Sequence, residues 1–419
     1  MRKCYYQCSF RQAAPLRLSN GENDRTDNDL MLDGNGMPFI PGSAIAGVLR
    51  SMLPEKEGNR LFGWIEQEAE KEQSAHESMI QISDGILRLE EDSRVHRTVR
   101  HGVGINDEGV AEDRRKYDFD VVETDSKYVS VLELTLPGES DPAEEATDSL
   151  MCQITAQGIS FGARTSRGYG NMTVSVRKRC FSLDRRSGPG GTEEWLSFDP
   201  FMPETFDGEP ISGVEAIETD GIIYKVGLRM TGSFSVRVYS SNPERSDYAP
   251  LTSMEGKPVL PGTGWAGVFR HHMRRLAGEA CMPAEISEKI DRLFGVCEEE
   301  HLKSRIRFSE TVIEGGKPLD VTRVALDRFT MKPRQRALFF STLWQDGSGT
   351  LEIRIAGEPD VTVKSLLEAT LLDLHFGLLN IGGEGNVGRG RAEITGLEIS
   401  GRPVDQLLGV EICAREAIS

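Results

Sequence analysis

The sequence lacks the short motifs that mark several common enzyme and metal-binding classes. It contains no Cys-x-x-Cys pair, no HExxH and no GxSxG, so the usual zinc sites, zinc proteases and serine hydrolases are not indicated. The seven cysteines are widely scattered, which favours reduced, mostly buried thiols over disulfides. Histidines, also seven, make no metal-binding spacing, and we expect surface positions for them. This group includes His96, His101, His271 and His272.

Long apolar runs and an excess of basic residues are also missing. No run approaches the ~18 to 20 apolar residues of a membrane helix, and residues 1–12 are charged rather than signal-like, so we expect a cytoplasmic protein with no membrane partner. Lys and Arg number 49 against 66 Asp and Glu, a net charge of −17. This argues against a surface that coats nucleic acid everywhere, but it allows one basic groove.

One pattern occurs twice, with a constant offset between the two halves of the chain. PFIPGSAIAGVLR at 38–50 returns as PVLPGTGWAGVFR at 258–270. Each copy predicts a short apolar strand that ends in Pro-Gly, then Ser43 or Thr263 as a helix N-cap. A capped helix start leaves backbone N–H groups that can meet an anion such as phosphate. Apolar residues at helical spacing give each helix one buried face: Ile45, Val48, Leu49 and Met52, and then Trp265, Val268, Phe269 and Met273.

The polar loop before each copy contains one repeated acid. With the same offset, which carries position 38 onto position 258, Asp27 falls on Asp247, whereas Asp33 meets Ser253. A lone acid in a polar loop is usually only solvated, and a shared turn could also explain the repetition. The internal repeat therefore makes Asp27 and Asp247 candidates without settling their role.

Further elements repeat in the same order. Each half opens with a strand segment, at 4–19 and 222–240, and has Leu-Phe-Gly after the helix that follows its Pro-Gly pair. Alternating strands follow at 79–87 and 304–313, then arginine-rich stretches, strands at 127–136 and 349–355, and helices at 143–157 and 364–378. The arginine-rich stretches are read as extended hairpins, with solvated surface loops as the equal alternative.

Each half ends in a glycine-rich loop that opens a strand. Gly162, Gly168 and Gly170 recur at Gly382, Gly388 and Gly390. The letters at 383–388 satisfy GxGxxG, but a dinucleotide fingerprint follows a strand and opens a helix, which this loop does not. Such loops let backbone N–H groups approach phosphate, although a plain tight turn is the simpler alternative. The arginines that accompany them are Arg164, Arg167, Arg389 and Arg391.

These observations predict an α+β protein with two similar domains. The expected bounds are 1–178 for the first domain, 179–218 for a linker, 219–402 for the second domain and 403–419 for a tail with a short helix and strand. A chain of 419 residues is long enough for two or three cores.

The combination of acidic loop, Pro-Gly corner, Leu-Phe-Gly and GARTSRGYGNM resembles the RAMP superfamily, and in particular the RNA-guided backbone subunits of type III CRISPR effector complexes. The resemblance covers roughly 1–178 and 219–400. It implies two ferredoxin-like (RRM-related) RAMP domains in tandem with inserted hairpins or thumbs. It further implies an endoribonuclease that binds guide crRNA, cleaves target RNA and contacts other CRISPR effector subunits.

The same resemblance assigns roles to residues. Asp27 and Asp247 are the implied catalytic acids, helped by a transiently bound divalent metal ion, Mg²⁺ or Mn²⁺. In the family pattern a second Asp lies between this acid and the Pro-Gly corner. Asp33 occupies that position after Asp27, but Ser253 occupies it after Asp247. A non-catalytic guide-binding scaffold and a filament-capping subunit remain the alternatives. The implied RNA contacts are Ser43, Arg50, Arg100, Arg164, Arg167, Gly168, Gly170, Thr263, Arg270, Arg323, Gly388, Arg389 and Gly390.

Overall fold

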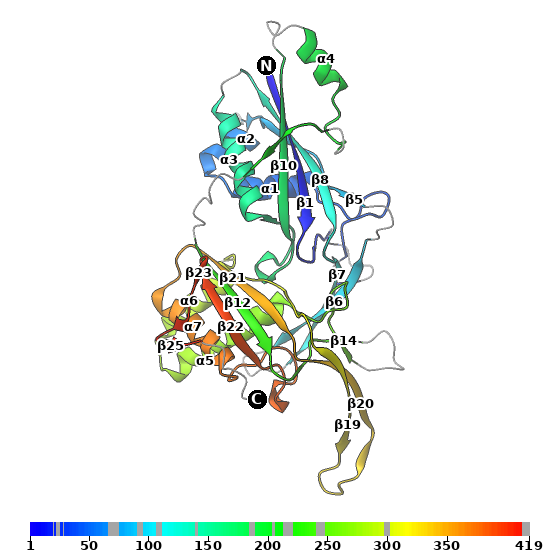
Figure 1. Cartoon of the computed structure of the whole chain (residues 1–419), viewed down its shortest axis with the longest axis vertical. Coiled ribbons are helices and arrows are strands. Elements are labelled where there is room, and N and C mark those ends of the chain that lie inside the picture. The colour runs from blue at the N-terminus through cyan, green and yellow to red at the C-terminus, as the bar shows by residue number, and fades with distance from the viewer. Residues whose placement is uncertain are drawn as a thin grey trace, which may run out of the picture. The chain divides into compact units, whose positions relative to one another are not determined.

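The chain forms two compact units of mixed α+β structure (Figure 1). The computed structural model describes residues 1–19, 21, 26–27, 29–65, 75–89, 95–105, 111–138, 141–183, 189–202, 206–212, 221–239, 248–296 and 302–412. Unit 1 comprises Met1–Val99, Asp118–Thr165 and Tyr169–Glu218, and unit 2 comprises Arg100–Tyr117, Ser166–Gly168 and Thr219–Ser419. The expected α+β class is confirmed, whereas the expected domain bounds stay a prediction.

Unit 1 is built on an antiparallel sheet in the order β11-β10-β1-β8-β4. Strand β1 (Arg2–Gln12) is central, because it pairs with β10 (Asn171–Ser182) on one side and with β8 (Lys127–Leu136) on the other. The other strands are β2 (Trp64–Ile65), β3 (Ala75–His76), β4 (Ile80–Ile82), β5 (Ile86–Arg88), β9 (Ile159–Ser160) and β11 (Glu209–Ile211). The helices are α1 (Gly42–Ser51), α2 (Glu55–Phe62), α3 (Pro142–Gln157) and α4 (Pro189–Ser197).

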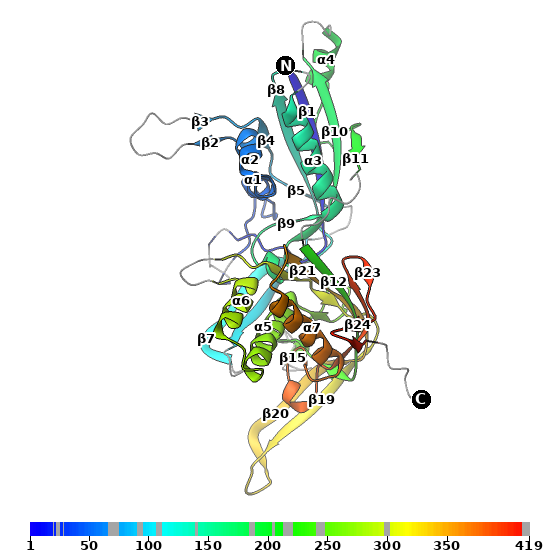
Figure 2. The ribbon, with the colours of Figure 1, turned by 90° about the vertical axis from the view of Figure 1, so that its left-hand side faces the viewer.

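Helices α1, α2 and α3 pack on one face of this sheet (Figure 2). The predicted apolar face of α1 is confirmed, because Ile45 and Leu49 are buried and Val48 and Met52 pack against the same core. The predicted helix at 143–157 is α3, whose N-cap Asp141 accepts a hydrogen bond from the Ala143 N–H. The helix α2, which ends at Leu-Phe-Gly, was not predicted.

The opposite face of the same sheet is covered by residues near α4. Tyr5, Phe181 and Phe206 are buried there against Trp195 and Phe198. The Trp195 Nε1–H donates to Tyr5 Oη at 2.8 Å, which satisfies both polar atoms of an otherwise apolar cluster.

Unit 2 repeats the arrangement with a sheet in the order β17-β21-β12-β22-β23. Its central strand is again the opening strand of its half. Trp265, Phe269 and Met273 of α5 are fully buried, so the predicted face of this helix is confirmed. The helices are α5 (Gly262–Glu279), α6 (Ala284–Phe294) and α7 (Val361–His375). The strands of this sheet are β12 (Gly221–Met230), β17 (Ile306–Phe308), β21 (Ser348–Ala356), β22 (Ala392–Ile399) and β23 (Arg402–Pro403).

Both arginine-rich stretches form hairpins, as predicted. One is β6 (Arg97–Ile105) with β7 (Ala111–Val122), and the other is β19 (Lys317–Leu326) with β20 (Pro333–Gln345). The second hairpin is a long two-stranded ribbon (Figure 1). The apolar side chains of Phe329 and Met331 near its tip are 93% and 72% exposed. The remaining strands are β13 (Ser233–Phe234), β14 (Arg237–Tyr239), β15 (Tyr248–Pro250), β16 (Val259–Leu260), β18 (Thr311–Val312), β24 (Gln406–Leu407) and β25 (Val410–Glu411).

The predicted helix caps are wrong. Helices α1 and α5 begin at Gly42 and Gly262, with Pro41 and Pro261 as N-caps and no side-chain cap, so Ser43 and Thr263 lie inside the first turn. The Gly42 N–H donates to Asp84 Oδ1 at 2.7 Å. The chain's own carboxylate therefore meets this helix start, where the sequence predicted a site for an external anion.

Two smaller expectations also fail. Two histidines are buried and not at the surface, since His272 and His375 are 1% and 7% exposed. His272 Nε2 lies 2.6 Å from Asp373 Oδ2 and bridges α5 and α7, and His375 Nδ1 accepts from the Ile394 N–H at 3.2 Å. Within residues 403–412 of the tail the structure has short strands but no helix. Across the described residues, no helix combines the length and apolar character needed to cross a membrane.

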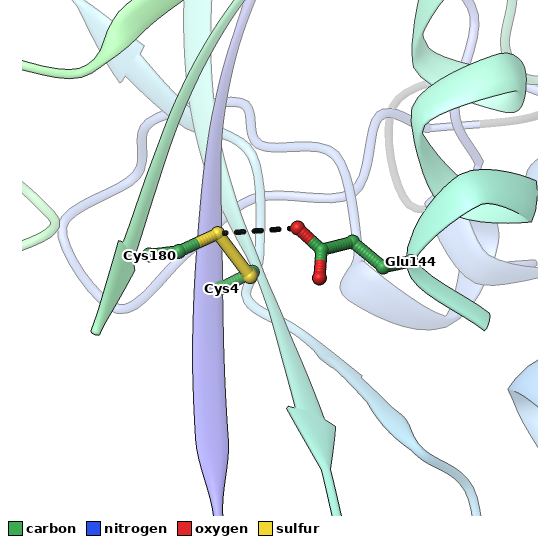
Figure 3. A group of neighbouring side chains, drawn as sticks. All are labelled: Cys4, Glu144 and Cys180. Atoms are coloured by element: carbon green, nitrogen blue, oxygen red, sulfur yellow. Dashed lines mark hydrogen bonds between the residues drawn. A yellow bond between two sulfur atoms is a disulfide. The ribbon is translucent and has the colours of Figure 1, made fainter. Parts of the chain in front are cut away.

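The expectation of reduced thiols is wrong for two cysteines, because Cys4 and Cys180 form a disulfide (Figure 3). They stand directly opposite each other in the β1–β10 pairing, with Cα atoms 4.1 Å apart. That proximity comes from strand register, which the scattered spacing does not reveal. Cys8, Cys152 and Cys281 are free, and burial raises the pKa of the Cys8 thiol to about 12.

Because the disulfide closes 176 residues of chain, Cys180→Ser should lower the free energy of unfolding by roughly 2–5 kcal/mol through the loop entropy of the unfolded state. We expect this loss in urea denaturation without reductant. The difference from wild type should vanish when reductant is present. Cys281→Ser, at an exposed free cysteine, is the control and should change nothing. Equal midpoints for wild type and Cys180→Ser without reductant would contradict the disulfide.

Candidate nucleic-acid interface

The two glycine-rich loops have the same backbone conformation. Each contains a 3₁₀ turn, Thr165–Arg167 in the first half and Gly385–Val387 in the second. Corresponding residues share a left-handed φ: Gly162 at +81° and Gly382 at +89°, Arg164 at +61° and Glu384 at +64°, Gly168 and Gly388 both at +83°, Gly170 at +72° and Gly390 at +76°. The predicted repeat of these loops is thus confirmed.

The last glycine of each loop has no room for a side chain. A Cβ atom at Gly170 would lie 1.9 Å from the Phe161 carbonyl oxygen, and one at Gly390 would lie 2.0 Å from the Ile381 carbonyl oxygen. At this glycine the backbone approaches the residue that directly precedes the loop, and the next strand begins shortly afterwards. A tight turn, the simpler alternative, is therefore present, and it fixes the side chains that the loop carries.

In the first half, arginines of the loop region stack on one aromatic ring. The guanidinium carbons of Arg17 and Arg164 lie 4.5 Å and 4.9 Å from the centre of the buried Phe119 ring. Tyr169 meets the same ring edge-on at 5.9 Å. Cation–π contacts of this kind hold planar guanidiniums in a defined orientation, so β7 positions the first loop's positive charge.

In the second half, three arginines surround one carboxylate. Glu384 is bonded by Arg237, Arg323 and Arg389. Burial alone would raise the pKa of Glu384, but the hydrogen bond from Arg323 and the charges of Arg237 and Arg389 outweigh it, so this pKa is lowered. Glu384 is therefore ionised at neutral pH.

Asp27 is exposed and is tied to β7. Its backbone N–H donates to Asp118 Oδ1 at 3.0 Å, and its own Oδ2 accepts from the Asp118 N–H at 2.9 Å. Asp118 precedes Phe119, so adjacent residues of one strand support the acid and the stacked arginines. Asp247 lies outside the described residues.

The pair Asp27 and Asp118 fits a hard divalent cation in its donor chemistry. Mg²⁺ and Mn²⁺ favour carboxylate oxygens, and these two carboxylates belong to residues in direct contact. Another grouping among the described residues, Cys4, Glu144 and Cys180, does not fit a metal. Its sulfurs are joined and cannot act as thiolates.

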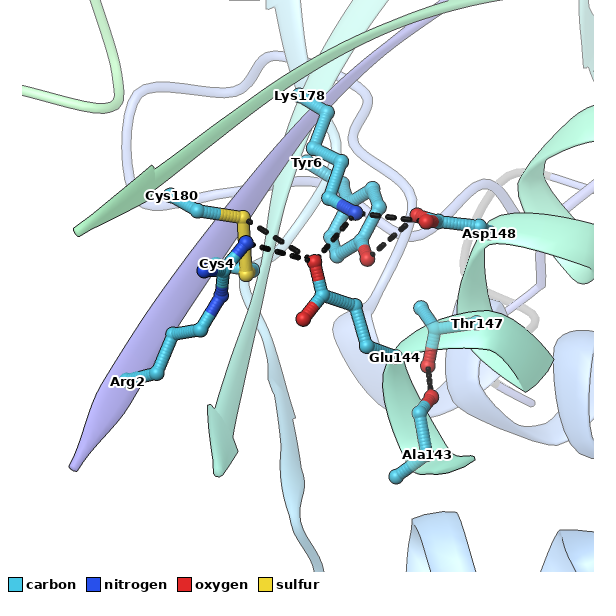
Figure 4. The surroundings of a disulfide bond; sticks show 9 residues. All are labelled: Arg2, Cys4, Tyr6, Ala143, Glu144, Thr147, Asp148, Lys178 and Cys180. Atoms are coloured by element: carbon cyan, nitrogen blue, oxygen red, sulfur yellow. Dashed lines mark hydrogen bonds and ion pairs between the residues drawn. A yellow bond between two sulfur atoms is a disulfide. The ribbon is translucent and has the colours of Figure 1, made fainter. Parts of the chain in front are cut away.

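Glu144 is also engaged by cations (Figure 4), with Arg2 Nη2 at 3.0 Å and Lys178 Nζ at 2.8 Å from its Oε1. Burial alone would raise the pKa of Glu144, but the hydrogen bonds and charges of Lys178 and Arg2 lower it overall. This carboxylate is part of a structural ion-pair network.

The remaining expected RNA contacts are distributed over both units. Ser43 and Arg50 are exposed on α1, and Thr263 lies in the first turn of α5. Arg270 Nη2 is 2.9 Å from Asp291. These positions keep their expected role as a prediction.

Two of the expected contacts are packed within unit 2. Arg100 is 3% exposed, with Nη1 2.6 Å from Glu310 Oε2. A Cβ at Gly168 would lie 2.7 Å from the Phe308 carbonyl oxygen, and the Arg167 carbonyl oxygen lies close to Gly262. Arg100 therefore belongs to a buried ion pair in this structure, and Gly168 to a close backbone contact.

Among the predicted residues, the structure brings Arg323 and Arg389 together and places Arg164 over Phe119. Sequence reasoning missed Arg17, Arg237, Asp118, Phe119 and Glu384. The offset of the internal repeat aligns Arg17 with Arg237 and Arg164 with Glu384, so the positions could have been found, but not their contacts.

Gly390→Ala should destabilise unit 2 more than Gly388→Ala. Both alanines would take a left-handed backbone, a cost of about 1–2 kcal/mol. Only Gly390 also faces a carbonyl, whereas nothing lies within 4 Å of a Cβ at Gly388. We expect a loss above about 4 kcal/mol for Gly390→Ala, measured by urea denaturation with tryptophan fluorescence. The close contact would be refuted by equal midpoints for the two variants.

Asp118→Ala should free the Asp27 amide, because it removes the acceptor of that N–H. Loss of a hydrogen bond worth roughly 0.5–1.5 kcal/mol predicts a several-fold faster amide exchange at Asp27. Asp118→Asn retains an oxygen acceptor and should exchange as wild type does. Equal protection in the alanine and wild-type proteins would argue against this contact.

Known proteins were compared with this chain. A chain of the cryo-EM structure of the type III-B Cmr-beta bound to cognate target RNA is 15% identical, with a TM-score of 0.34 over 43% of this chain and 61% of that chain. The search of curated proteins returned no match. The family profile described as RAMP superfamily matches residues 14–173 and 191–393, most of both halves. The chain is therefore a member of the RAMP superfamily, with two successive regions that match the family.

Proposed function

We propose that this protein is a backbone subunit of a type III CRISPR effector complex, which binds guide crRNA and cleaves complementary target RNA. The observation that carries the proposal is the role of β7. Its adjacent residues Asp118 and Phe119 contact Asp27 of the acidic loop and two arginines, Arg164 of the glycine-rich loop and Arg17. An acid and a phosphate-binding loop thus share one support. The membership of the RAMP superfamily is consistent with this role.

We also propose that each half is a ferredoxin-like, RRM-related domain. When the four main strands of each half are numbered in chain order, both sheets have the order 4-1-3-2. This order is β10-β1-β8-β4 in unit 1 and β22-β12-β21-β17 in unit 2. Two helices per half lie between these strands in sequence at the expected places, α1 and α3 in unit 1, and α5 and α7 in unit 2. This strand order supports a βαββαβ unit in each half.

The proposed reaction is transesterification of the target RNA. A ribose 2′-oxygen attacks the adjacent phosphorus, the bond from phosphorus to the 5′-oxygen breaks, and the products are a 2′,3′-cyclic phosphate and a 5′-hydroxyl. Asp27 takes the proton of the 2′-hydroxyl, and the leaving oxygen gains a proton from solvent. A positioned general base contributes about 10²- to 10⁴-fold to such a step.

A divalent ion held by Asp27 and Asp118 would neutralise charge that develops on the phosphate. The chain's own contribution is positional. Reciprocal hydrogen bonds fix the Asp27 loop to β7, which limits the motion of the carboxylate before RNA arrives.

A non-catalytic guide scaffold is the second candidate for the second half. One observation favours it: Glu384 places a negative charge in the loop where the first half has Arg164. A filament-capping role would also leave this half without cleavage.

Asp27→Asn should abolish one class of cut while leaving the fold intact. The amide oxygen can still accept from the Asp118 N–H, but it cannot act as a base, so cleavage opposite the first half should fall about 10²- to 10⁴-fold. The assembled complex is tested with labelled complementary RNA, with Asp247→Asn and the double variant in parallel. Guide affinity should not change.

Asp125→Asn is the control, since this exposed acid pairs with Arg11 at 3.0 Å and is not in the Asp27–Asp118 pair. The catalytic assignment fails if the double variant cuts at wild-type positions and rates. Guide binding without any cut by the wild-type complex would favour the scaffold.

A further inference from the structure

Glu384 occupies a position that carries a cation in the other half of the chain. The offset of the internal repeat places it on Arg164, and both residues adopt the left-handed backbone of the same loop. Arg164 lies over an aromatic ring, whereas Glu384 is 8% exposed and enclosed by arginines. One scaffold thus presents opposite charges in the two halves.

The three arginines come from separate elements of unit 2. Arg237 belongs to β14, Arg323 to β19, and Arg389 follows the 3₁₀ turn of the loop. Arg237 is further oriented by the Tyr248 ring, 5.2 Å from its guanidinium carbon. Guanidiniums that converge on one point are typical of sites for phosphate or carboxylate.

Glu384 does not neutralise all the positive charge of this cluster. Three cations face one anion, which leaves two positive charges in excess. Arg237 and Arg323 are 39% and 37% exposed, so this excess is open to solvent. Within the described part of the chain, the buried Nε of Arg323 has no hydrogen-bond partner, so donors outnumber the acceptors that Glu384 supplies.

We propose that Arg237, Arg323 and Arg389 form a phosphate-binding site that Glu384 fills as an internal anion, and that Glu384 thereby weakens the hold of the second half on single-stranded RNA. A carboxylate and a phosphodiester present similar paired oxygens to a guanidinium. An RNA phosphate must therefore displace Glu384 or share its arginines. The first half carries no acid at the matching position, so the two loops differ in their affinity for phosphate.

The lowered pKa of Glu384 is consistent with this role, since the internal anion is present at neutral pH. The inference rests on the proposed function only where it takes the RNA of the effector complex as the natural ligand. The predicted difference between variants holds for any RNA phosphate.

The test compares variants that remove one negative charge each. Glu384→Gln keeps the size of the side chain and releases the arginines. Glu393→Gln is the matched control, because it removes the same charge in unit 2 and releases Arg229, whose Nη2 lies 2.6 Å from Glu393. Affinity of the full chain for a labelled uridine homopolymer is measured over a range of salt concentrations.

We expect Glu384→Gln to bind about tenfold more tightly than Glu393→Gln at low salt, a difference of about 1.4 kcal/mol. The slope of log K against log salt should steepen by about 0.7 for each added phosphate contact. Adding Arg323→Ala should remove the gain. Glu384→Gly, which suits a left-handed backbone, repeats the test if the glutamine variant is poorly folded by circular dichroism.

Equal or weaker binding by Glu384→Gln and Glu384→Gly, relative to Glu393→Gln, would overturn the inference and make Glu384 an organiser of the arginines. Failure of the proposed function looks different. In that case wild-type complex neither binds guide nor cleaves target, while the difference between the Glu384 and Glu393 variants can still appear.

Discussion

The close approach of a helix start to the end of a neighbouring strand underlies both halves of this protein. A Cβ at Gly42 would lie 2.6 Å from the Ile82 carbonyl oxygen, and one at Gly262 would lie 2.5 Å from the Phe308 carbonyl oxygen. Because glycine has no side chain at these two positions, the first turn of each helix can pack directly against the backbone of the neighbouring strand. The apolar faces of α1 and α5 then reach the core of their units.

Much of the fold could be predicted because the signals are local or repeated. The strand at 127–136 and the helix at 143–157 follow from residue periodicity, and the constant offset of the repeat pairs the glycine loops. The helix caps were mispredicted, because Asp84 reaches Gly42 only through tertiary structure. Likewise, the disulfide depends on β1–β10 register, which brings Cys4 opposite Cys180.

The candidate site was only partly accessible from sequence. Asp27 could be identified because the repeat that pairs it with Asp247 and the resemblance of its loop to family loops are both visible in the sequence. Its partner Asp118 lies in an arginine-rich stretch without clear periodicity, and the link between them is a pair of hydrogen bonds from backbone N–H groups to side-chain carboxylates. Arg323 was a candidate for its charge alone, whereas its contact with Glu384 requires the β19–β20 hairpin to lie beside the loop.

The β19–β20 hairpin also has a consequence for handling the protein alone. Its tip is held by Asp327, which accepts from the N–H groups of Phe329 and Thr330 at 3.0 Å and 2.8 Å. The turn is thus ordered while Phe329 and Met331 are 93% and 72% exposed. Exposed apolar side chains on such a turn favour the association of purified chains. The net charge of −17 opposes that association through mutual repulsion, and concentrated salt, by screening it, favours aggregation.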